Sequence, residues 1–226
     1  YWIALLLVPI IGFAVGIVLE RLVIRPTIRQ ASLTIVTTFG LSMMLQEGVR
    51  AIYGAQPRRM EAPIEGTLPL FGIDYDVYRL FAAAFAALCL IAFFAFLTRT
   101  KLGTWIRAVR HDPETATALG VPVARICAIT FGLGTAMAFL GGVIAAPITT
   151  VEFRTGVDIL PFCFMAVIIG GLGNLQGTVA AAVLLAVLEG LVTSVTDPTI
   201  ARIISLAFMS VVLLVRPNGL FSGATR

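Results

Sequence analysis

The chain has 226 residues, of which 59% are hydrophobic and only 12% are charged, and its mean hydropathy is +1.00. Soluble domains carry about twice that share of charged residues, so the composition excludes an ordinary water-soluble enzyme, a disulfide-rich secreted scaffold and a disordered tail. Basic residues at a cytoplasmic membrane edge explain the net charge of +4 more simply than nucleic-acid binding does, and we expect no nucleic-acid partner.

Seven apolar runs are predicted to be membrane segments, because about 20 apolar residues cross the hydrocarbon core of a bilayer. The fifth run is short and ends in Gly170, Gly171 and Gly173, so a broken or re-entrant helix is an alternative there. The first run begins at Tyr1, and we expect the chain to start partway into a longer protein. The seven runs are residues 2–19, 33–49, 80–97, 126–146, 159–172, 178–195 and 200–215.

The distribution of basic residues predicts how these segments are oriented. Ten of the sixteen Lys and Arg residues lie in residues 20–32, residues 98–125 and the C-terminal tail, which the positive-inside rule places in the cytoplasm. The loop of residues 50–79 is then extracytoplasmic, and its Pro and Gly residues predict turns and short extended pieces. We therefore predict an all-α, polytopic transmembrane helical bundle in contact with lipid, formed as a single domain by residues 1–226.

Small residues recur at four-residue spacing in three of the runs, where each set shares one helix face. Tight packing around a translocation path and generic helix packing are both consistent with this pattern. The three sets are Gly12 and Gly16; Gly134, Ala138, Gly142 and Ala146; and Ala182, Ala186 and Gly190.

Polar residues inside the apolar runs are candidates for a translocation path. Thr38, Ser42 and Gln46 share one face of the second run, where they could contact the charged groups of an amino acid. Hydrogen bonding between helices is the alternative interpretation. The backbone of residues 170–177 could also line the path, although a tight turn between two helices explains those glycines as well.

Glu189 lies within the sixth run, where an ionisable group is costly and usually faces a partner or a watery cavity. It could line or gate the path, or it could pair with Arg202 or the hydroxyl of Thr193. Three isolated Cys residues and a single His predict neither a disulfide framework nor a metal site.

The cytoplasmic loop of residues 98–125 carries the signals of a short helix outside the membrane. Asp112 is a favourable N-cap, Pro113 suits the first helical position, and Glu114 lies in the first turn. Gly120 and Pro122 end the helix, which we predict over residues 113–119. A short, stiff helix of this kind is suited to entering a groove on another protein.

The spacing Glu114-Thr115-Ala116-x3-Gly120 resembles the E-A-A-x3-G coupling loop of ABC importer permeases, with Thr115 in place of the first Ala and without the usual downstream I-x-L-P. Further segments make the whole chain resemble the high-affinity branched-chain amino-acid permease family, nearer its LivH type than its LivM partner. The family's N-terminal N-x-A-H-G segment is missing. The segments are residues 19–26 (L-E-R-L-V-I-R-P), 37–46 (T-T-F-G-L-S-M-M-L-Q), 101–121 (K-L-G-x3-R-A-V-R-x-D, ending in L-G-V), 166–179 (A-V-I-I-G-G-L-G-N-L-Q-G-T-V), 188–191 (L-E-G-L) and 216–221 (R-P-N-G-L-F).

The resemblance implies ATP-driven import of branched-chain or related amino acids across a bacterial cytoplasmic membrane. It implies a second, LivM-like permease subunit or a second copy of this chain, two ATP-binding subunits and a periplasmic binding protein. ATP and Mg²⁺ would bind the partner subunits, since this sequence has no G-x4-G-K-[ST] phosphate loop and is not expected to be an enzyme. In the coupling helix, Glu114 and Gly120 would set its position, and Ala116 and Leu119 would make the contact.

Three other functions remain open at this point. Similar permeases are associated with urea and short amides, so a urea or short-amide ABC permease is one of them. A passive urea-type channel is the second, and it would not associate with an ATPase. The third is an ion-coupled secondary transporter that uses Glu189 as its switch.

Overall fold

The computed structural model describes residues 1–27, 30–64, 66–70, 73–171 and 173–194, and beyond these only positions 197, 200, 204, 206, 207, 210 and 212. The chain forms two compact units, one of Tyr1–Phe153 and one that begins at Arg154. The predicted run of residues 200–215 falls mostly outside the described residues, and the motif of residues 216–221 falls entirely outside them.

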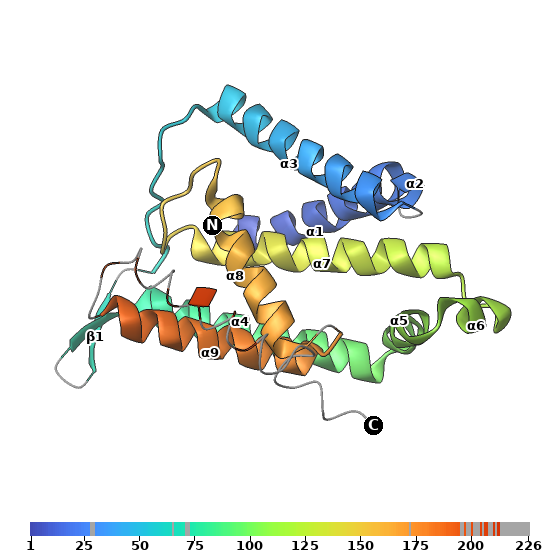
Figure 1. Cartoon of the computed structure of the whole chain (residues 1–226). Coiled ribbons are helices and arrows are strands. Elements are labelled where there is room, and N and C mark those ends of the chain that lie inside the picture. The colour runs from blue at the N-terminus through green and yellow to red at the C-terminus, as the bar shows by residue number, and fades with distance from the viewer. Residues whose placement is uncertain are drawn as a thin grey trace. The chain divides into compact units, whose positions relative to one another are not determined.

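The first unit consists of helices and one small antiparallel hairpin (Figure 1). Its first helix continues without a break through a π-helical turn. The hairpin lies in the predicted extracytoplasmic loop, and its register pairs Thr67 with Asp76 and Leu70 with Ile73. The elements are α1 (Trp2–Leu19), η1 (Glu20–Ile24), α2 (Arg25–Thr27), α3 (Ala31–Tyr53), β1 (Thr67–Leu70), β2 (Ile73–Asp76), α4 (Val77–Arg99), α5 (Lys101–His111), α6 (Pro113–Ala118) and α7 (Val123–Ala145).

Four helices in the described part of the chain are long and apolar enough to cross a membrane: Trp2–Thr27, α4, α7 and α9 (Leu175–Thr193). The helix α8 (Thr155–Gly170) is apolar but has only 16 residues. The 23-residue helix α3 contains the predicted second run, but its Thr, Ser, Gln and Glu residues leave it outside this set of four. The all-α membrane fold is confirmed, whereas the expected count of about seven segments is not.

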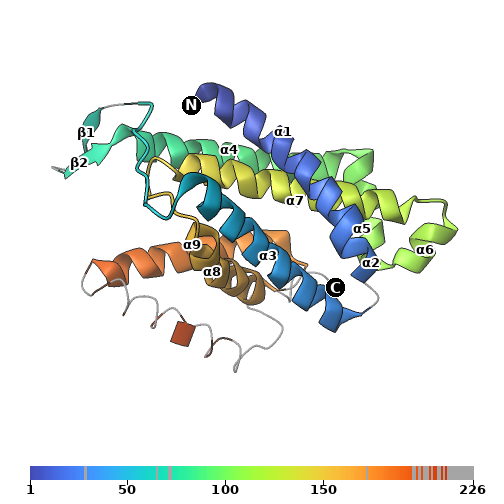
Figure 2. The same cartoon turned by 90° about the horizontal axis from the view of Figure 1, so that it is seen from above.

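The tightest packing in the first unit is between α1 and α7, which lie next to each other in Figure 1 and cross in Figure 2. A Cβ atom at Gly16 would lie 2.7 Å from Thr135 Oγ1 and 2.8 Å from the Cα of Gly132. A Cβ at Gly12 would lie 2.8 Å from the ring of Phe139. The predicted pair Gly12 and Gly16 is therefore a helix-packing motif, in which missing side chains allow close contact.

A second cluster joins the N-terminal ends of α1 and α4 to the C-terminal end of α7. Tyr78 is fully buried, and its hydroxyl donates a 2.9 Å hydrogen bond to the carbonyl of Ile144. The hydroxyls of Tyr1 and Tyr78 are 2.7 Å apart and share a further hydrogen bond. Because the carbonyl of Ile144 lies in the last turn of α7, this contact satisfies a backbone acceptor that the helix itself leaves unpaired.

The second unit is built on the helices α8 and α9, which pack through Met165, Ile169, Ala181 and Leu185. The glycine-rich segment between them is the predicted tight turn. Gly171 and Gly173 have φ angles of 92° and 86°, which favour glycine, and a Cβ at Gly170 would lie 2.4 Å from the Cα of Thr178.

Candidate functional site

The helix α6 begins at a well-formed N-terminal cap. Asp112 Oδ1 accepts hydrogen bonds from the backbone N–H groups of Glu114, at 2.9 Å, and Thr115, at 3.1 Å. The hydroxyl of Thr115 donates to Asp112 Oδ2, and this bond together with the Thr115 N–H holds the pKa of the Asp112 carboxyl below its usual range. The predicted cap is confirmed, and Thr115 acts as its second member.

The helix ends as sharply as it begins. Gly120 has a φ of 81°, and its N–H donates to the carbonyl of Thr117 at 3.0 Å. The next N–H, that of Val121, donates to the carbonyl of Ala116 at 3.0 Å. These two bonds form a Schellman motif, in which a left-handed residue closes the last turn. The structure thus ends the helix at Ala118, with Leu119 as the C-cap.

Nearly all of this short helix is accessible. Leu119 exposes 78% of its surface, and Glu114 and Thr115 are also exposed. Ala116 differs from the rest because only 2% of it is exposed. Within the chain, α6 contacts α5 and α7. The outward surface of α6 is therefore formed by Leu119 and the polar residues, while Ala116 faces the chain's own interior.

The helix α5 was not predicted, because its residues were interpreted as part of a loop. Thr100 Oγ1 accepts from the N–H of Gly103 at 3.1 Å and so caps its N-terminus. A Cβ at Gly103 would collide with the carbonyl of Leu97, so only glycine permits this sharp turn out of α4. Arg107 also donates a hydrogen bond to the carbonyl of Leu97, near the end of α4. Apolar residues at three- and four-residue spacing were the missed signal: Leu102, Trp105, Ile106 and Val109.

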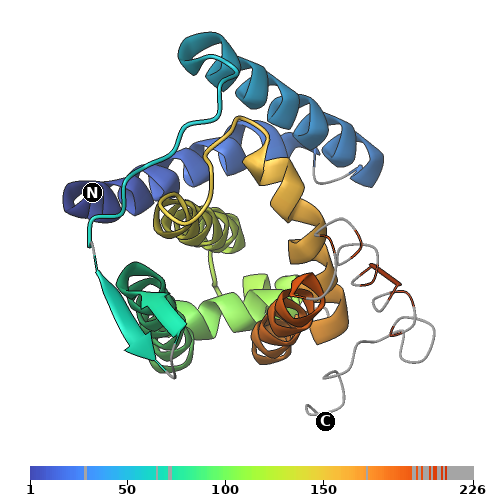
Figure 3. The same cartoon turned by 90° about the vertical axis from the view of Figure 1, so that its left-hand side faces the viewer.

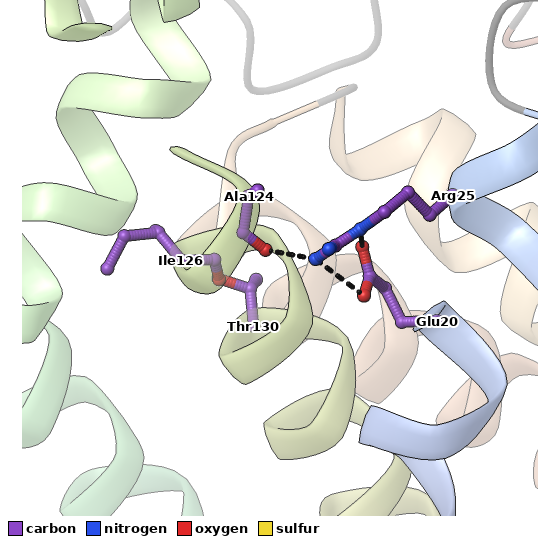
Figure 4. Close-up of polar contacts among 5 residues, drawn as sticks. All are labelled: Glu20, Arg25, Ala124, Ile126 and Thr130. Atoms are coloured by element: carbon purple, nitrogen blue, oxygen red, sulfur yellow. Dashed lines mark hydrogen bonds and ion pairs between the residues drawn. The ribbon is translucent and has the colours of Figure 1, made fainter. Parts of the chain in front are cut away.

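A charged contact ties the first long helix to the start of α7 (Figure 4). Arg25 Nη2 lies 3.2 Å from Glu20 Oε2 and donates a 2.7 Å hydrogen bond to the carbonyl of Ala124. Glu20 and Arg25 lie at the two ends of the π-helical turn η1, where a bond from the N–H of Arg25 to the carbonyl of Glu20 spans five residues. Such turns insert one residue into a helix and frequently occur at functional sites.

Burial makes this contact more than a surface ion pair. The side chain of Glu20 is only 7% exposed, whereas that of Arg25 is 43% exposed. A buried carboxylate needs a partner, and Arg25 supplies it while also holding the segment that leads from α6 into α7. No pattern in the sequence predicted this contact.

A cavity of about 820 Å³ lies beside this ion pair. Its walls come from η1, α5 and α7 and are mostly apolar, with Ile24, Ile106, Val109, Ile126 and Phe131 among the lining residues. Gly134 and Ala138 also line it. The predicted small-residue stripe of α7 therefore faces this cavity at these two positions. The helix α1 packs on Gly132, Thr135 and Phe139, of which Thr135 also lines the cavity.

The three polar path candidates of α3 lie along one face, as predicted. Gln46 Nε2 donates to Ser42 Oγ at 3.0 Å, and Thr38 Oγ1 donates to the carbonyl of Thr34 at 2.8 Å. None of the described side chains of α3 is buried, and Ser42 is exposed. The hydrogen bonds of these three residues lie within the helix. Their role in a path stays a prediction.

The remaining path candidates, Gly170, Gly171, Gly173 and Glu189, belong to the second unit. The glycines form the turn before α9, and Glu189 is half-buried within that helix. The hydroxyl of Thr193 donates to the backbone carbonyl of Glu189 at 2.7 Å and not to its carboxylate. Arg202, the other expected partner, lies outside the described residues. Among the residues that the structure describes, no group of three potential ligands could hold a metal ion.

Comparison with known proteins gives one consistent result. The family profile described as the permease component of branched-chain amino acid transport systems matches residues 1–215. The high-affinity branched-chain amino acid transport permease LivH of Salmonella typhimurium is 27% identical over 222 residues, covering 93% of this chain and 71% of that protein. LivH of Escherichia coli is 25% identical and BraD of Pseudomonas aeruginosa 26% identical, with the same coverage. No solved structure matches the chain.

Proposed function

We infer the function from one established premise: this chain belongs to the family of branched-chain amino acid transport permeases. It is a multi-pass membrane protein that serves as a permease subunit of an ABC transporter and is not an enzyme. Family membership favours this function over a passive channel or an ion-coupled carrier. The similar proteins are named for branched-chain amino acids, which also argues against urea or a short amide as the solute.

The finer assignment is that the chain imports leucine, isoleucine, valine or a related amino acid through a bacterial cytoplasmic membrane. It pairs with a LivM-like permease or with a second copy of itself. Two ATP-binding subunits hold ATP and Mg²⁺ on the cytoplasmic side, and an extracytoplasmic binding protein delivers the solute. The distribution of basic residues supports this orientation, because it places residues 98–125 in the cytoplasm.

The observation that carries the proposal is the exposed, doubly capped helix α6. Its backbone is closed by Asp112 at one end and Gly120 at the other, so the helix is a rigid element. Leu119, the C-cap of this helix, exposes 78% of its surface. An apolar side chain held by a rigid helix is suited to a pocket on another protein. We assign α6 as the contact with the ATP-binding subunit, in which Glu114, Thr115 and Gly120 set the geometry and Leu119 makes the apolar contact.

The same segment explains how force from the partner would reach the membrane helices. Ala116 is buried against the chain, and the residues after Gly120 lead directly to Ala124, whose carbonyl is held by Arg25. A displacement of α6 therefore acts on both α7 and the end of the first helix. Thr38, Ser42, Gln46, Glu189 and the 170–173 turn remain the candidates for the surfaces that the solute then meets.

The first experiment tests the docking of α6. Leu119→Cys is introduced into a variant whose Cys89, Cys127 and Cys163 are replaced, and the permease is co-expressed with its ATP-binding subunits. We expect a bifunctional thiol reagent to link Cys at 119 to a single-cysteine ATP-binding subunit. Leu22→Cys is the matched control, because Leu22 exposes 71% of its surface but lies on η1. Equal cross-linking from both positions would contradict the assignment.

The second experiment separates docking from transport. Gly120→Trp adds a large side chain at a left-handed position that only small residues adopt easily, so the inserted protein should hydrolyse ATP without solute uptake. Gly120→Asn is the control, because Asn tolerates that backbone conformation and should retain uptake. Normal leucine uptake by Gly120→Trp would defeat the proposal. Uptake of urea in preference to leucine by the wild type would overturn the solute class alone.

A further inference from the structure

The helix α5 lies across the direction of α4 and α7. In Figure 1 it is seen nearly end-on while α4 and α7 run across the view, and in Figure 3 the reverse holds. Since α4 and α7 are two of the helices that can span a membrane, α5 runs roughly in the plane of the bilayer at the end of α4. An amphipathic helix in this orientation is typical of the interface between lipid headgroups and acyl chains.

The composition of α5 matches that location. Leu102, Ile106 and Val109 are half-buried on one face, next to the exposed Trp105. Lys101, Arg107 and Arg110 lie on the rest of the helix, which contains no acidic residue. Tryptophan is enriched at membrane interfaces, and clusters of basic residues beside a membrane segment attract anionic lipids.

The cavity beside α5 has the size and chemistry for the apolar part of such a lipid. Its volume of about 820 Å³ lies within the range of small-molecule sites, roughly 300–1,000 Å³. Ile106 and Val109 of α5 form one wall together with Arg110, and Gly134 and Ala138 of α7 are among the residues of another. The Glu20 carboxylate at the wall is paired with Arg25, so it presents no uncompensated negative charge to an anionic headgroup.

We propose that this cavity binds one acyl chain of an anionic phospholipid, whose headgroup is held by the basic residues of α5, with Arg110 nearest the cavity. Apolar walls and a basic rim together fit an anionic amphiphile better than a neutral lipid or an apolar peptide. Because α5 leads directly into Asp112, the bound lipid also fixes the base from which α6 projects. The inference uses the membrane location of the protein but does not depend on which solute it carries.

The binding test uses Trp105 as the reporter. Trp2→Phe leaves Trp105 as the single tryptophan of this chain, which is reconstituted in phosphatidylcholine vesicles with a tryptophan-free variant of its permease partner. Equal mole fractions of brominated phosphatidylglycerol or brominated phosphatidylcholine are then compared as quenchers. We expect stronger quenching by phosphatidylglycerol, and Arg110→Gln should lower that preference about fivefold, since one cation near an anionic surface contributes about 1 kcal/mol. Equal quenching by the two lipids in the wild type would overturn the proposal.

The cavity itself is tested with two glycines of α7. A Cβ at either Gly134 or Gly141 would meet no atom within 4 Å, but only Gly134 lines the cavity. Native mass spectrometry should show phosphatidylglycerol retained by the wild type and by Gly141→Leu, and lost from Gly134→Leu. Ala138→Leu, on the same wall, provides a second test if Gly134→Leu does not insert.

Three outcomes would contradict this site. Phosphatidylglycerol retained equally by Gly134→Leu, Ala138→Leu and Gly141→Leu would show that the lipid binds elsewhere. Loss of the second permease subunit from Gly134→Leu, with lipid retention unchanged, would assign the cavity to a partner helix. The third outcome combines two results: high salt abolishes the quenching of Trp105, and Gly134→Leu retains phosphatidylglycerol normally. Together they would indicate that the lipid is bound by headgroup attraction alone. Since no solute or ATP is present, failure here leaves the transport proposal intact.

Discussion

Arg25 donates a 2.7 Å hydrogen bond to the backbone carbonyl of Ala124, 99 positions further along the chain. The same guanidinium pairs with the buried carboxylate of Glu20, so one side chain connects the end of the first long helix to the segment that follows α6. A movement of α6 therefore cannot be transmitted to α7 alone.

Arg25→Gln should weaken both the fold and the transmission of force. It removes the partner of the Glu20 carboxylate and a charged hydrogen bond to Ala124, so we expect a loss of about 1–3 kcal/mol in the free energy of unfolding. The value should fall in the lower part of that range because Arg25 is 43% exposed. Thermal unfolding in detergent measures the stability, and the ratio of uptake to ATP hydrolysis measures coupling.

Two further variants test whether the loss of stability comes from the contact between Arg25 and Glu20. Arg21→Gln is the control, since Arg21 is an exposed neighbour on η1, and we expect no loss of stability. In the Arg25→Gln background, Glu20→Gln should restore part of the stability because it removes the unpaired buried charge. If Arg21→Gln and Arg25→Gln unfold at the same temperature, the contact contributes nothing measurable.

Gly16→Ala should weaken the packing of α1 against α7. The new Cβ would lie 2.7 Å from Thr135 Oγ1 and 2.8 Å from the backbone of Gly132, and the backbone cannot yield cheaply. We expect about 1–3 kcal/mol of destabilisation, as is typical of overpacking. Gly40→Ala is the matched control in α3, where a Cβ would meet nothing within 4 Å. It should be neutral or slightly stabilising, and a comparison of melting temperatures tests the pair.

Tyr78→Phe should destabilise the cluster that joins the N-terminal ends of α1 and α4 to the C-terminal end of α7. The substitution keeps the buried ring but removes the hydroxyl that donates to the carbonyl of Ile144 and bonds to Tyr1. Loss of a buried hydrogen bond costs about 1–3 kcal/mol. Tyr75→Phe, at a tyrosine that is 47% exposed, should have almost no effect. Indistinguishable melting temperatures for the two variants would show that the Tyr78 hydroxyl is energetically neutral.

The cap of α6 should depend on pH only under acidic conditions. The hydroxyl and N–H of Thr115, followed by the N–H of Glu114, lower the pKa of Asp112 in the folded protein. A lowered pKa means that the stabilisation is fully present above the unfolded value, about 3.9, and is lost as the pH falls through the folded value. Amide exchange at Glu114 and Thr115, corrected for intrinsic rates, should be unchanged between neutral and mildly acidic pH and should rise in strong acid.

The matched variants for this prediction are Asp112→Asn and Asp112→Ala. Asn is also a good N-cap, so Asp112→Asn should keep α6 protected and remove the acid dependence. Asp112→Ala should increase exchange at Glu114 and Thr115 at every pH. Exchange in the wild type that rises already near neutral pH would exclude Asp112 as the titrating group.

The elements of the site that could be predicted are those with local causes. Asp112, Pro113 and Gly120 specify the ends of α6 through cap chemistry and backbone conformation, and the structure confirms these roles. The long apolar runs likewise predict α1, α4, α7 and α9 to within a few residues. The helix α5 could have been predicted from its apolar spacing, but its many basic residues favoured the interpretation as a loop.

The contacts that could not be predicted are those between distant segments. Arg25 meets Ala124 because α1 packs against α7, and no local pattern specifies that pairing. Four-residue spacing correctly places Gly134 and Ala138 on one face of α7, but it does not specify that α1 packs instead on Gly132 and Thr135. Likewise, a helical spacing placed Ala116 beside Leu119 without indicating that only Leu119 is exposed.

The two closed ends of α6 determine how it can meet another subunit. Its terminal amide and carbonyl groups are already paired within the chain, by Asp112 before it and by the turn at Gly120 after it. Association therefore requires no coil-to-helix transition in this segment, which lowers the loss of backbone conformational entropy on binding. A helix that is already closed at both ends can move with its partner in every transport cycle without refolding, which suits a contact that must act repeatedly.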